Sequence, residues 1–349
     1  MTVRVGINGF GRIGRHVARI LAAGADGLEL AAINTTRSDP AMLVHLMRYD
    51  SVHGRFPGEV RAEEERLVVE GRPVRVTAHR DPAEADWRGA GVEVVVEATG
   101  AFNDGELARR HLRAGAERVL ITAPAPRVDA TIVLGANEET LDPERHRVIS
   151  GASCTTMCLA PVARILDEAL GIEGGFVTTV HAYTRDQELV DGSHDDLRRA
   201  RAAALNIVPT KTGAARTLGE VLPHLAGRLG AMAVRVPVAD VSLLALSVSV
   251  RGGADADEVN ARYREAATGT ALGTIVGTTD EPLVSSDLIG DPRSAVVDLG
   301  ATRTGPGNVV QVMAWYDNEV AYAHRMIDLV RLLAGAGRPA ASLASAHPG

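Results

Sequence analysis

A glycine-rich segment near the N-terminus is the feature that most constrains the fold of this chain. Residues 3–8 form a short apolar run, the segment GFGRIG (9–14) follows, and apolar residues then recur at helical spacing over 13–23. A second apolar strand is expected at 28–33. In such a unit the first glycine permits a tight turn, the second lets the backbone approach a pyrophosphate, and the third lets the helix pack on the strand. The segment therefore predicts a dinucleotide-binding βαβ unit, and a bare structural turn is the weaker interpretation.

The rest of the first half continues this alternation. Apolar strands are expected at 74–77, 92–96 and 118–122, with a helix-like stretch at 106–115 between the last two. Strands that alternate with helices are typical of a doubly wound parallel sheet. We therefore predict an α/β fold whose Rossmann dinucleotide-binding domain spans residues 1–151.

A different pattern begins with the turn and helix predicted at 151–170. Strands are expected at 176–182, 231–238, 241–251 and 309–314, and helices at 257–268 and 319–334. The polar stretch 184–204 is too long for an ordinary connection, and loops of that length are usually functional or disordered. We predict an α+β catalytic domain with a mixed sheet at 152–317, a C-terminal helix at 318–334 that packs back on the cofactor domain, and a frayed tail at 335–349.

Charge and cysteine content exclude several classes of protein. The 349 residues carry 37 basic and 44 acidic side chains, a net charge of −7, which argues against a general nucleic-acid binder. The two cysteines, Cys154 and Cys158, rule out a disulfide framework and a zinc site built from cysteine pairs, and we predict no metal site. The sequence shows neither an apolar signal segment nor a membrane-length apolar run, so we expect a cytoplasmic protein without membrane partners.

The end of the second strand bears on the choice of cofactor. An acidic residue about 20 positions after the glycines normally binds the ribose 2′-hydroxyl of NAD. Here the segment INTTRS (33–38) contains hydroxyls and Arg37, and the first acid is Asp39. This composition favours NADP over NAD, and the alternative is a loop that makes no cofactor contact.

A cysteine and a histidine form a candidate catalytic pair. Cys154 precedes an apolar helical run, and a thiol in the first turn of a helix should have a lowered pKa. Cys158 lies one turn further and is expected to be a core residue. His181 ends an apolar strand at the start of the polar loop, where a base can assist a nucleophile.

Cationic and hydroxyl side chains suggest an anion site. Arg199 lies in the polar loop, and Arg235 lies within an apolar strand, where a buried guanidinium needs an anionic partner. The segment TKTG (210–213) offers hydroxyls and backbone N–H groups. The plainer interpretations are a solvated charge for the loop arginines and a structural ion pair for Arg235.

At this point the chain resembles the phosphorylating glyceraldehyde-3-phosphate dehydrogenase family over residues 2–334. The resemblance rests on VGINGFGRIGR (5–15), HLMRYDSVHGRF (45–56), ASCTT (152–156), TVHAYT (179–184), DLRRARAAALNIVP (196–209), TGAA (212–215), RVP (235–237) and WYDNE (315–319). It implies a Rossmann domain, a catalytic domain with a long S-shaped loop, and a homotetramer. It also implies the oxidation of glyceraldehyde 3-phosphate to 1,3-bisphosphoglycerate, and the reverse.

The resemblance assigns a role to each matching position. Cys154 looks like the thiolate that forms the thiohemiacetal and thioester, and His181 like its base. Thr184 and Arg235 resemble the substrate-phosphate site, Arg199 lies near both phosphates, and the inorganic-phosphate site comprises Ser153, Thr155, Thr212 and Gly213. The implied positions for NADP or NAD are Gly9, Phe10, Gly11, Arg12, Ile13, Gly14, Asn34, Thr35, Thr36, Arg37, Thr99, Gly100, Thr122, Ser193 and Asn318.

One loop position adds to the cofactor argument. Members that use NAD tend to carry Leu-Pro before His194, whereas members that use NADP tend to carry a serine there. Ser193 would then reach the 2′-phosphate of a cofactor on a neighbouring subunit. Two separate positions, Thr35 and Ser193, thus favour NADP, with dual specificity as the alternative.

The chain also departs from the family pattern near the site. The unusual residues are Met157, Arg185, Lys211, Val320 and Ala321. One hypothesis is a specialised isoform biased toward the reductive direction or resistant to a thiol-directed inhibitor. Two further alternatives are a dehydrogenase for another phosphorylated aldehyde, such as erythrose 4-phosphate, and a non-catalytic binding protein. The intact segment 212–215 argues against the former, and the intact Cys154–His181 pair argues against the latter.

Overall fold

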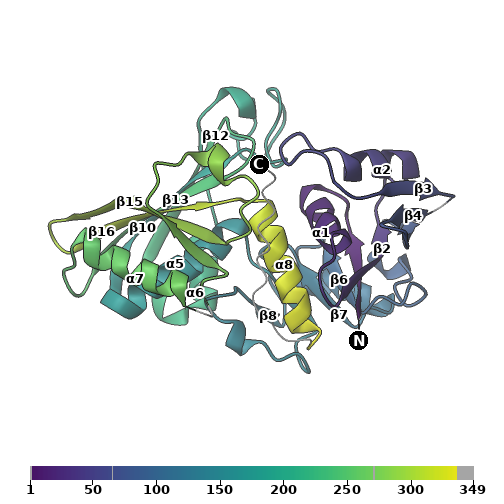
Figure 1. Cartoon of the computed structure of the whole chain (residues 1–349), viewed down its shortest axis with the longest axis horizontal. Helices are drawn as coiled ribbons and strands as arrows, with labels where there is room; N and C mark the ends of the chain where they lie inside the picture. The colour runs from purple at the N-terminus through teal and green to yellow at the C-terminus, as the bar shows by residue number, and fades with distance from the viewer. Residues whose placement is uncertain (1, 65, 270–271, 336–349) are drawn as a thin grey trace.

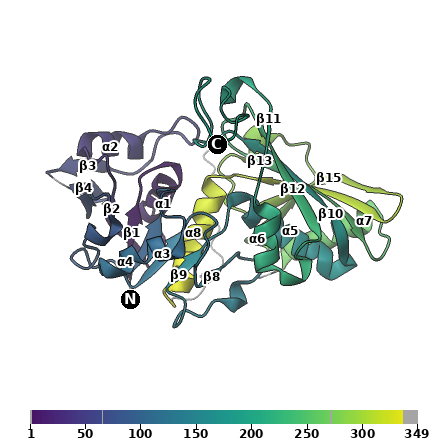
Figure 2. The same cartoon turned by 180° about the vertical axis from the view of Figure 1, so that it is seen from behind.

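The computed structural model describes residues 2–64, 66–269 and 272–335. Two β-sheets lie side by side, and the C-terminal helix α8 (Val320–Leu333) runs between them (Figures 1 and 2). The predicted tail therefore lies, beyond Gly335, outside the described residues. Among the described residues, no helix combines the length and apolar character needed to cross a membrane.

The first sheet contains the dinucleotide-binding unit predicted from the glycines. Its order is β3-β4-β5-β2-β1-β6-β7-β9-β8, parallel throughout except for the antiparallel β3-β4-β5 edge. Its strands are β1 (Val3–Asn8), β2 (Leu28–Asn34), β3 (Val60–Glu63), β4 (Arg66–Val69), β5 (Arg72–Thr77), β6 (Val94–Glu97), β7 (Arg118–Ile121), β8 (Ala130–Thr131) and β9 (Val148–Ser150). Its helices are α1 (Arg12–Ala22), α2 (Pro40–Arg48), α3 (Gly105–Ala108) and α4 (Arg110–Arg113).

The position of β1 explains why the glycines matter. It pairs with β2 on one side and with β6 on the other, so the chain leaves it where the strand order reverses. Ligands of open α/β sheets bind outside the carboxyl ends of the strands at such a switch point. The glycine turn between β1 and α1 occupies that place.

The second sheet is mixed, as predicted. Its order is β11-β12-β10-β13-β16-β15-β14, in which β10–β12 and β14–β15 pair parallel and the other neighbours antiparallel. Alternate residues of β13 are buried, as expected for a strand with one face on the core. The strands are β10 (Ile172–Ala182), β11 (Val208–Thr210), β12 (Leu229–Val236), β13 (Ser242–Val250), β14 (Val276–Thr279), β15 (Ala295–Gly305) and β16 (Val309–Tyr316), and the helices are α5 (Cys154–Leu170), α6 (Ala214–Val221) and α7 (Ala256–Thr268).

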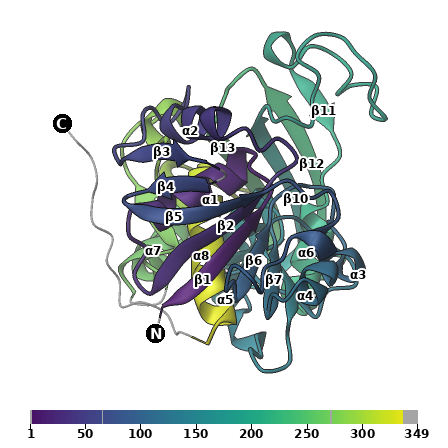
Figure 3. The ribbon, with the colours of Figure 1, turned by 90° about the vertical axis from the view of Figure 1, so that its right-hand side faces the viewer.

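Helix α8 joins the two halves. It packs against α1, β6 and β7 of the first sheet, although it follows β16 of the second. The long loop predicted at 184–204 extends away from the body of the molecule beside β11 (Figure 3). Among the described residues, the 3₁₀ turn η3 (Ala203–Leu205) begins within this loop. The other 3₁₀ turns are η1 (Pro82–Glu84), η2 (Glu138–Thr140), η4 (Pro223–Leu225) and η5 (Ser285–Leu288).

Some elements differ from the prediction. The single helix expected at 106–115 is two short helices, α3 and α4, which meet at Arg109. Helix α2 was not predicted, although Asp39 caps it through Ala41 N and Pro40 opens it. The strands β3, β4, β8, β9, β11, β14 and β15 and the helix α6 were also missed.

Candidate active site

Cys154 is the first residue of α5, at the junction of the two halves. Ser153 caps the helix, since its Oγ accepts a hydrogen bond of 3.1 Å from Thr156 N. The unpaired N–H groups of this first helical turn favour negative charge nearby. The helix thus places a thiol at an end suited to anions.

His181 lies beside that thiol. Its Nε2 is 3.5 Å from Cys154 Sγ, and its Nδ1 is 2.7 Å from the carbonyl oxygen of Ala182. In the tautomer with the proton on Nδ1, that nitrogen donates to the carbonyl, which Arg235 Nη1 also contacts, and Nε2 presents a lone pair to the thiol. Burial lowers the pKa of His181 to about 3, and the charge of Arg235 adds to this effect, so the ring is neutral at physiological pH.

The ionisation of Cys154 differs from the prediction. Burial raises the pKa of its thiol, although Arg235 and the backbone N–H of Thr155 oppose this shift. The helix terminus alone therefore does not set the charge of the Cys154 thiol, and the prediction of a lowered pKa is wrong. The resting pair is a thiol beside a neutral imidazole that can accept its proton.

Arg235 brings a positive charge to the same place. It is the register partner of His181 on β12, and its Nη1 lies 3.0 Å from Ala182 O and 3.3 Å from Thr184 Oγ1. It forms no ion pair with any described carboxylate, and its buried Nε has no hydrogen-bond partner among the described residues. The structural ion pair considered for Arg235 is therefore absent, and the guanidinium is left to bind an external anion.

A second group of the residues predicted to bind phosphate surrounds Arg199, which is itself paired with Asp186. Its Nε donates to Thr210 Oγ1 at 2.9 Å, its Nη2 donates to Lys211 O at 3.1 Å, and Asp186 pairs with Nη1. Nearby, Thr212 Oγ1 accepts from Ala214 N at 3.3 Å, and Gly213 precedes α6. The loop and the start of α6 thus hold the predicted residues together.

Two residues predicted to bind phosphate use their hydroxyls within the protein. Thr155 is buried, and its Oγ1 lies 3.0 Å from Tyr316 Oη. Ser153 Oγ contacts both the N–H and the Oγ1 of Thr156. Sequence reasoning missed Tyr316, which also lies 2.7 Å from Thr179 Oγ1 and supports the strand that carries His181.

The glycine turn has the shape that a dinucleotide requires. Gly9 has φ +99°, and a Cβ at Gly14 would lie 2.0 Å from Gly9 O. A Cβ at Gly11 would meet nothing within 4 Å, so the backbone there is open to a ligand. Phe10 and Ile13 pack against the core. These observations fit the three roles assigned to the glycines.

Asn34, another predicted cofactor residue, is occupied internally. Its Nδ2 donates to Asn8 Oδ1 at 2.7 Å and to His79 O at 2.9 Å, while its Oδ1 accepts from Thr77 Oγ1 and His79 N. All hydrogen-bonding positions of this amide are used. Asn34 therefore fixes the loop that follows it, and that loop presents Thr35 and the exposed Thr36 and Arg37.

Three further predicted cofactor positions follow the carboxyl ends of β6 and β7, whereas Ser193 lies in the long loop. Thr99 is exposed and donates to Glu97, Gly100 has φ +76°, and Thr122 Oγ1 donates to Glu97 O at 3.0 Å. Ser193 is exposed in the long loop.

Asn318 is placed by two neighbours. Its Oδ1 accepts a 2.7 Å hydrogen bond from Ser242 Oγ, and its Nδ2 has no partner among the described residues. The next residue, Glu319, binds Arg12 of the glycine turn, with 2.7 Å between Arg12 Nε and Glu319 Oε1. This contact brings Asn318 to the cofactor side of the junction. Ser242 was not predicted, and no local signal marks it.

Two family profiles match the chain. The "Glyceraldehyde 3-phosphate dehydrogenase, NAD binding domain" matches residues 3–105, and the "Glyceraldehyde 3-phosphate dehydrogenase, C-terminal domain" matches residues 153–318.

Curated relatives cover almost the whole chain. Glyceraldehyde-3-phosphate dehydrogenase 2 of Streptomyces arenae is 53% identical over 95% of this chain and 99% of its own length. Glyceraldehyde-3-phosphate dehydrogenase of Pseudomonas aeruginosa is 51% identical over 96% and 99% of the two chains. Glyceraldehyde-3-phosphate dehydrogenase 1 of Bacillus subtilis is 49% identical over 97% and 100%. The chain belongs to the glyceraldehyde 3-phosphate dehydrogenase family.

Proposed function

We propose that this protein catalyses the phosphorylating oxidation of glyceraldehyde 3-phosphate to 1,3-bisphosphoglycerate, and the reverse reaction. The observation that carries this proposal is the thiol of Cys154 held 3.5 Å from a neutral imidazole, beside a guanidinium that forms no ion pair with a described residue. A thiol, a base and a free cation are the groups that a phosphorylated aldehyde needs. The family membership supports the same reaction.

The first step joins the aldehyde to the thiol. Arg235 and Thr184 bind the substrate phosphate, which places the aldehyde carbon at Cys154. His181 Nε2 accepts the thiol proton as Sγ attacks and then gives it to the aldehyde oxygen, so the ring is neutral again when the adduct is complete. The product of this step is a thiohemiacetal.

The second step oxidises that adduct. The nicotinamide cofactor supplies the hydride acceptor, and the open backbone at Gly11 and the free Nδ2 of Asn318 fit such a group. His181 takes the hydroxyl proton as the hydride leaves, and a thioester remains on Cys154. Inorganic phosphate near Thr212, Gly213 and Arg199 then attacks the thioester and releases the acyl phosphate.

We propose further that NADP is preferred over NAD at this site. The first acid after β2, Asp39, lies five residues beyond Asn34 and caps α2 through a 3.1 Å hydrogen bond from Ala41 N to its Oδ1. Arg37 has no ion-pair partner among the described residues. A cavity of about 730 Å³ adjoins this loop, and its lining includes Arg66 and Arg75 as well as Asp39 and Glu64. A free cation and hydroxyls favour a 2′-phosphate, and Ser193 of a neighbouring subunit would add to them.

The homotetramer is a further part of the proposal. Large apolar side chains at least 70% exposed lie at one position of β10 and along residues 189–207, and exposed apolar surface of this kind marks sites of protein–protein contact. They are Phe176, Leu189, Val190, Leu197, Leu205 and Ile207. We also propose the division into a cofactor domain (1–151), a catalytic domain (152–317) and a returning helix (318–334), and a cytoplasmic location, which suits the two unpaired cysteines.

Absorbance of the reduced cofactor tests the proposal. Glyceraldehyde 3-phosphate is added with NADP or NAD, in the presence and absence of inorganic phosphate. We expect sustained turnover only with phosphate, and a higher kcat/KM with NADP. No reduction of either cofactor would refute the enzyme, and sustained turnover without phosphate would refute the phosphorylating route.

A further inference from the structure

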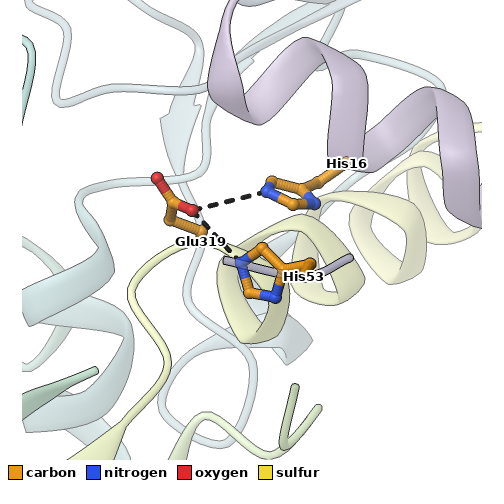
Figure 4. Close-up of side chains that lie close together, drawn as sticks. All are labelled: His16, His53 and Glu319. Carbon is orange, nitrogen blue, oxygen red and sulfur yellow. Dashed lines mark hydrogen bonds and ion pairs between the residues drawn. The ribbon is translucent and has the colours of Figure 1, made fainter. Parts of the chain in front are cut away.

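A compact group of titratable side chains lies where α1 meets the start of α8, outside the catalytic pair. His16 comes from α1, His53 from the segment after α2, and Glu319 immediately precedes α8 (Figure 4). Glu319 Oε2 lies 3.4 Å from His16 Nε2 and 3.2 Å from His53 Nε2. The two imidazole rings meet edge to face, with centroids 4.5 Å apart. Three ligand-type atoms thus converge from three separate segments.

His16 is not satisfied by this arrangement. Its side chain is 4% exposed, and its Nε2 has no hydrogen-bond partner among the described residues despite the nearby carboxylate. His16 Nε2 and Glu319 Oε2 are 3.4 Å apart, but their orientation does not allow a hydrogen bond between them. A buried polar atom without a partner costs free energy, so a ligand between the two atoms would stabilise the site.

A second carboxylate borders the group. Asp240 is 2% exposed, its Oδ2 lies 3.0 Å from His53 Nε2, and neither of its oxygens accepts a hydrogen bond from a described residue. Asp317 also lies within reach of His53. Arg12 and Arg15 are permanent cations near Glu319, and Arg12 is paired with both Asp50 and Glu319. The cluster therefore has more buried carboxylates than fixed positive charges.

We propose that His16, His53 and Glu319 bind a divalent cation of the zinc type. In a tetrahedral site with metal–ligand bonds of about 2.0–2.2 Å, neighbouring ligand atoms lie about 3.3–3.6 Å apart. The observed separations of 3.4 and 3.2 Å are close to that edge length. Two imidazoles and one carboxylate suit zinc and leave its fourth position to water.

The surrounding residues complete the arrangement. Asp240, whose oxygens lack hydrogen bonds, lies beside His53 and would accept from a water in the fourth position, as outer partners of metal sites do. The cation would tie α1 and the segment after α2 to the start of α8. The sequence predicted no metal site, because its two histidines and its glutamate are far apart along the chain and show no ligand spacing.

Cobalt and zinc titrations of the full chain test this site. After treatment with a chelator and desalting, Co²⁺ is added and its visible absorption is recorded, and Zn²⁺ binding is measured by calorimetry. We expect one equivalent of Co²⁺ with visible bands but without the near-ultraviolet thiolate-to-cobalt band, and displacement by Zn²⁺. Binding at Cys154 would instead produce the thiolate band, and the Cys154→Ser chain removes that competing ligand.

Variants in the Cys154→Ser chain assign the ligands. His16→Asn should weaken Zn²⁺ binding by at least the roughly 10–100-fold that loss of an outer partner costs. His224→Asn is the matched control, because its exposed ring pairs with Asp167, away from the cluster, and Zn²⁺ affinity should not change. Circular dichroism checks that each chain is folded, and Glu319→Gln gives a second ligand test. No binding by the parent chain at millimolar Zn²⁺, or equal binding by the parent and His16→Asn, would overturn the proposal.

Discussion

Arg235 Nη1 lies 3.0 Å from His181 Nδ1, because the two residues are register partners on the parallel strands β12 and β10. The proposed base and the proposed phosphate-binding cation are therefore held by one pair of strands. The positive charge of Arg235 also contributes to the lowered pKa of His181. The guanidinium therefore helps to keep the imidazole neutral.

Replacement of Arg235 by Lys should separate phosphate binding from general catalysis. A charged hydrogen bond contributes about 1.5–3 kcal/mol, so KM for glyceraldehyde 3-phosphate should rise roughly 10–100-fold. Glyceraldehyde, which lacks the phosphate, is the matched control substrate, and its kcat/KM should fall much less. Equal losses for both aldehydes would show that Arg235 only supports the fold around His181.

Replacement of His181 by Asn should slow the chemistry without preventing substrate binding. Loss of a general base costs about 10²–10⁴-fold, and this loss should appear in kcat rather than KM. The pKa of His181 is about 3, so the residue should contribute no acid limb to kcat/KM between pH 5 and 8. A limb near pH 6.5 that disappears in His181→Asn would contradict this assignment.

Restoring an acid at the end of β2 should change the choice of cofactor. In Thr35→Asp the new carboxylate repels the 2′-phosphate of NADP. The ratio of kcat/KM with NADP to that with NAD should therefore fall by about tenfold or more, because about 1.4 kcal/mol of repulsion corresponds to a factor of ten. Thr35→Asn is the neutral control of equal size and should leave most of that ratio intact. An unchanged ratio in Thr35→Asp would count against the proposed contact.

Lys211 adds a positive charge where the family usually has a small hydroxyl residue. Its side chain is exposed, has no partner among the described residues, and lies next to Thr212 and Gly213. An exposed charge contributes about 0.2–1 kcal/mol, so Lys211→Thr should raise KM for inorganic phosphate only a few-fold. The difference should vanish in high salt, because salt screens exposed charges. A difference that persists in high salt would indicate a direct, buried contact.

The cofactor unit was predictable because its signals are local. The turn GFGRIG requires glycines for reasons of backbone conformation and close approach, and β1, α1 and β2 lie within one residue of the predicted bounds. The edge hairpin of β3 and β4 was missed, since each strand is only four residues long and shows little alternation.

The active site was predictable only in part. Cys154 and His181 could be singled out, but their 3.5 Å approach depends on how α5 packs against β10. The ionisation of Cys154 was misjudged, because burial depends on the whole fold and not on the first turn of one helix. The contacts of Tyr316 and Ser242, and the His16–His53–Glu319 group, join segments that are far apart along the chain. They therefore produce no local sequence pattern from which they could be predicted.

The covalent role of Cys154 can be checked against a neighbouring thiol. Cys154→Ser should reduce turnover by at least about 10³-fold, since a hydroxyl does not replace the thiol as nucleophile and leaving group. Cys158→Ala is the control, because Cys158 is fully buried one helical turn away and should influence stability more than kcat. Substantial turnover by Cys154→Ser would remove that residue from the mechanism.

Mass spectrometry of the trapped intermediate tests the central claim most directly. The chain is mixed with glyceraldehyde 3-phosphate and the oxidised cofactor without inorganic phosphate, quenched in acid and digested. We predict a 3-phosphoglyceryl thioester on the peptide that contains both cysteines, retained in Cys158→Ala, absent in Cys154→Ser, and lost from the unaltered chain when phosphate is added. No acyl adduct, or one that persists in Cys154→Ser, would contradict the account.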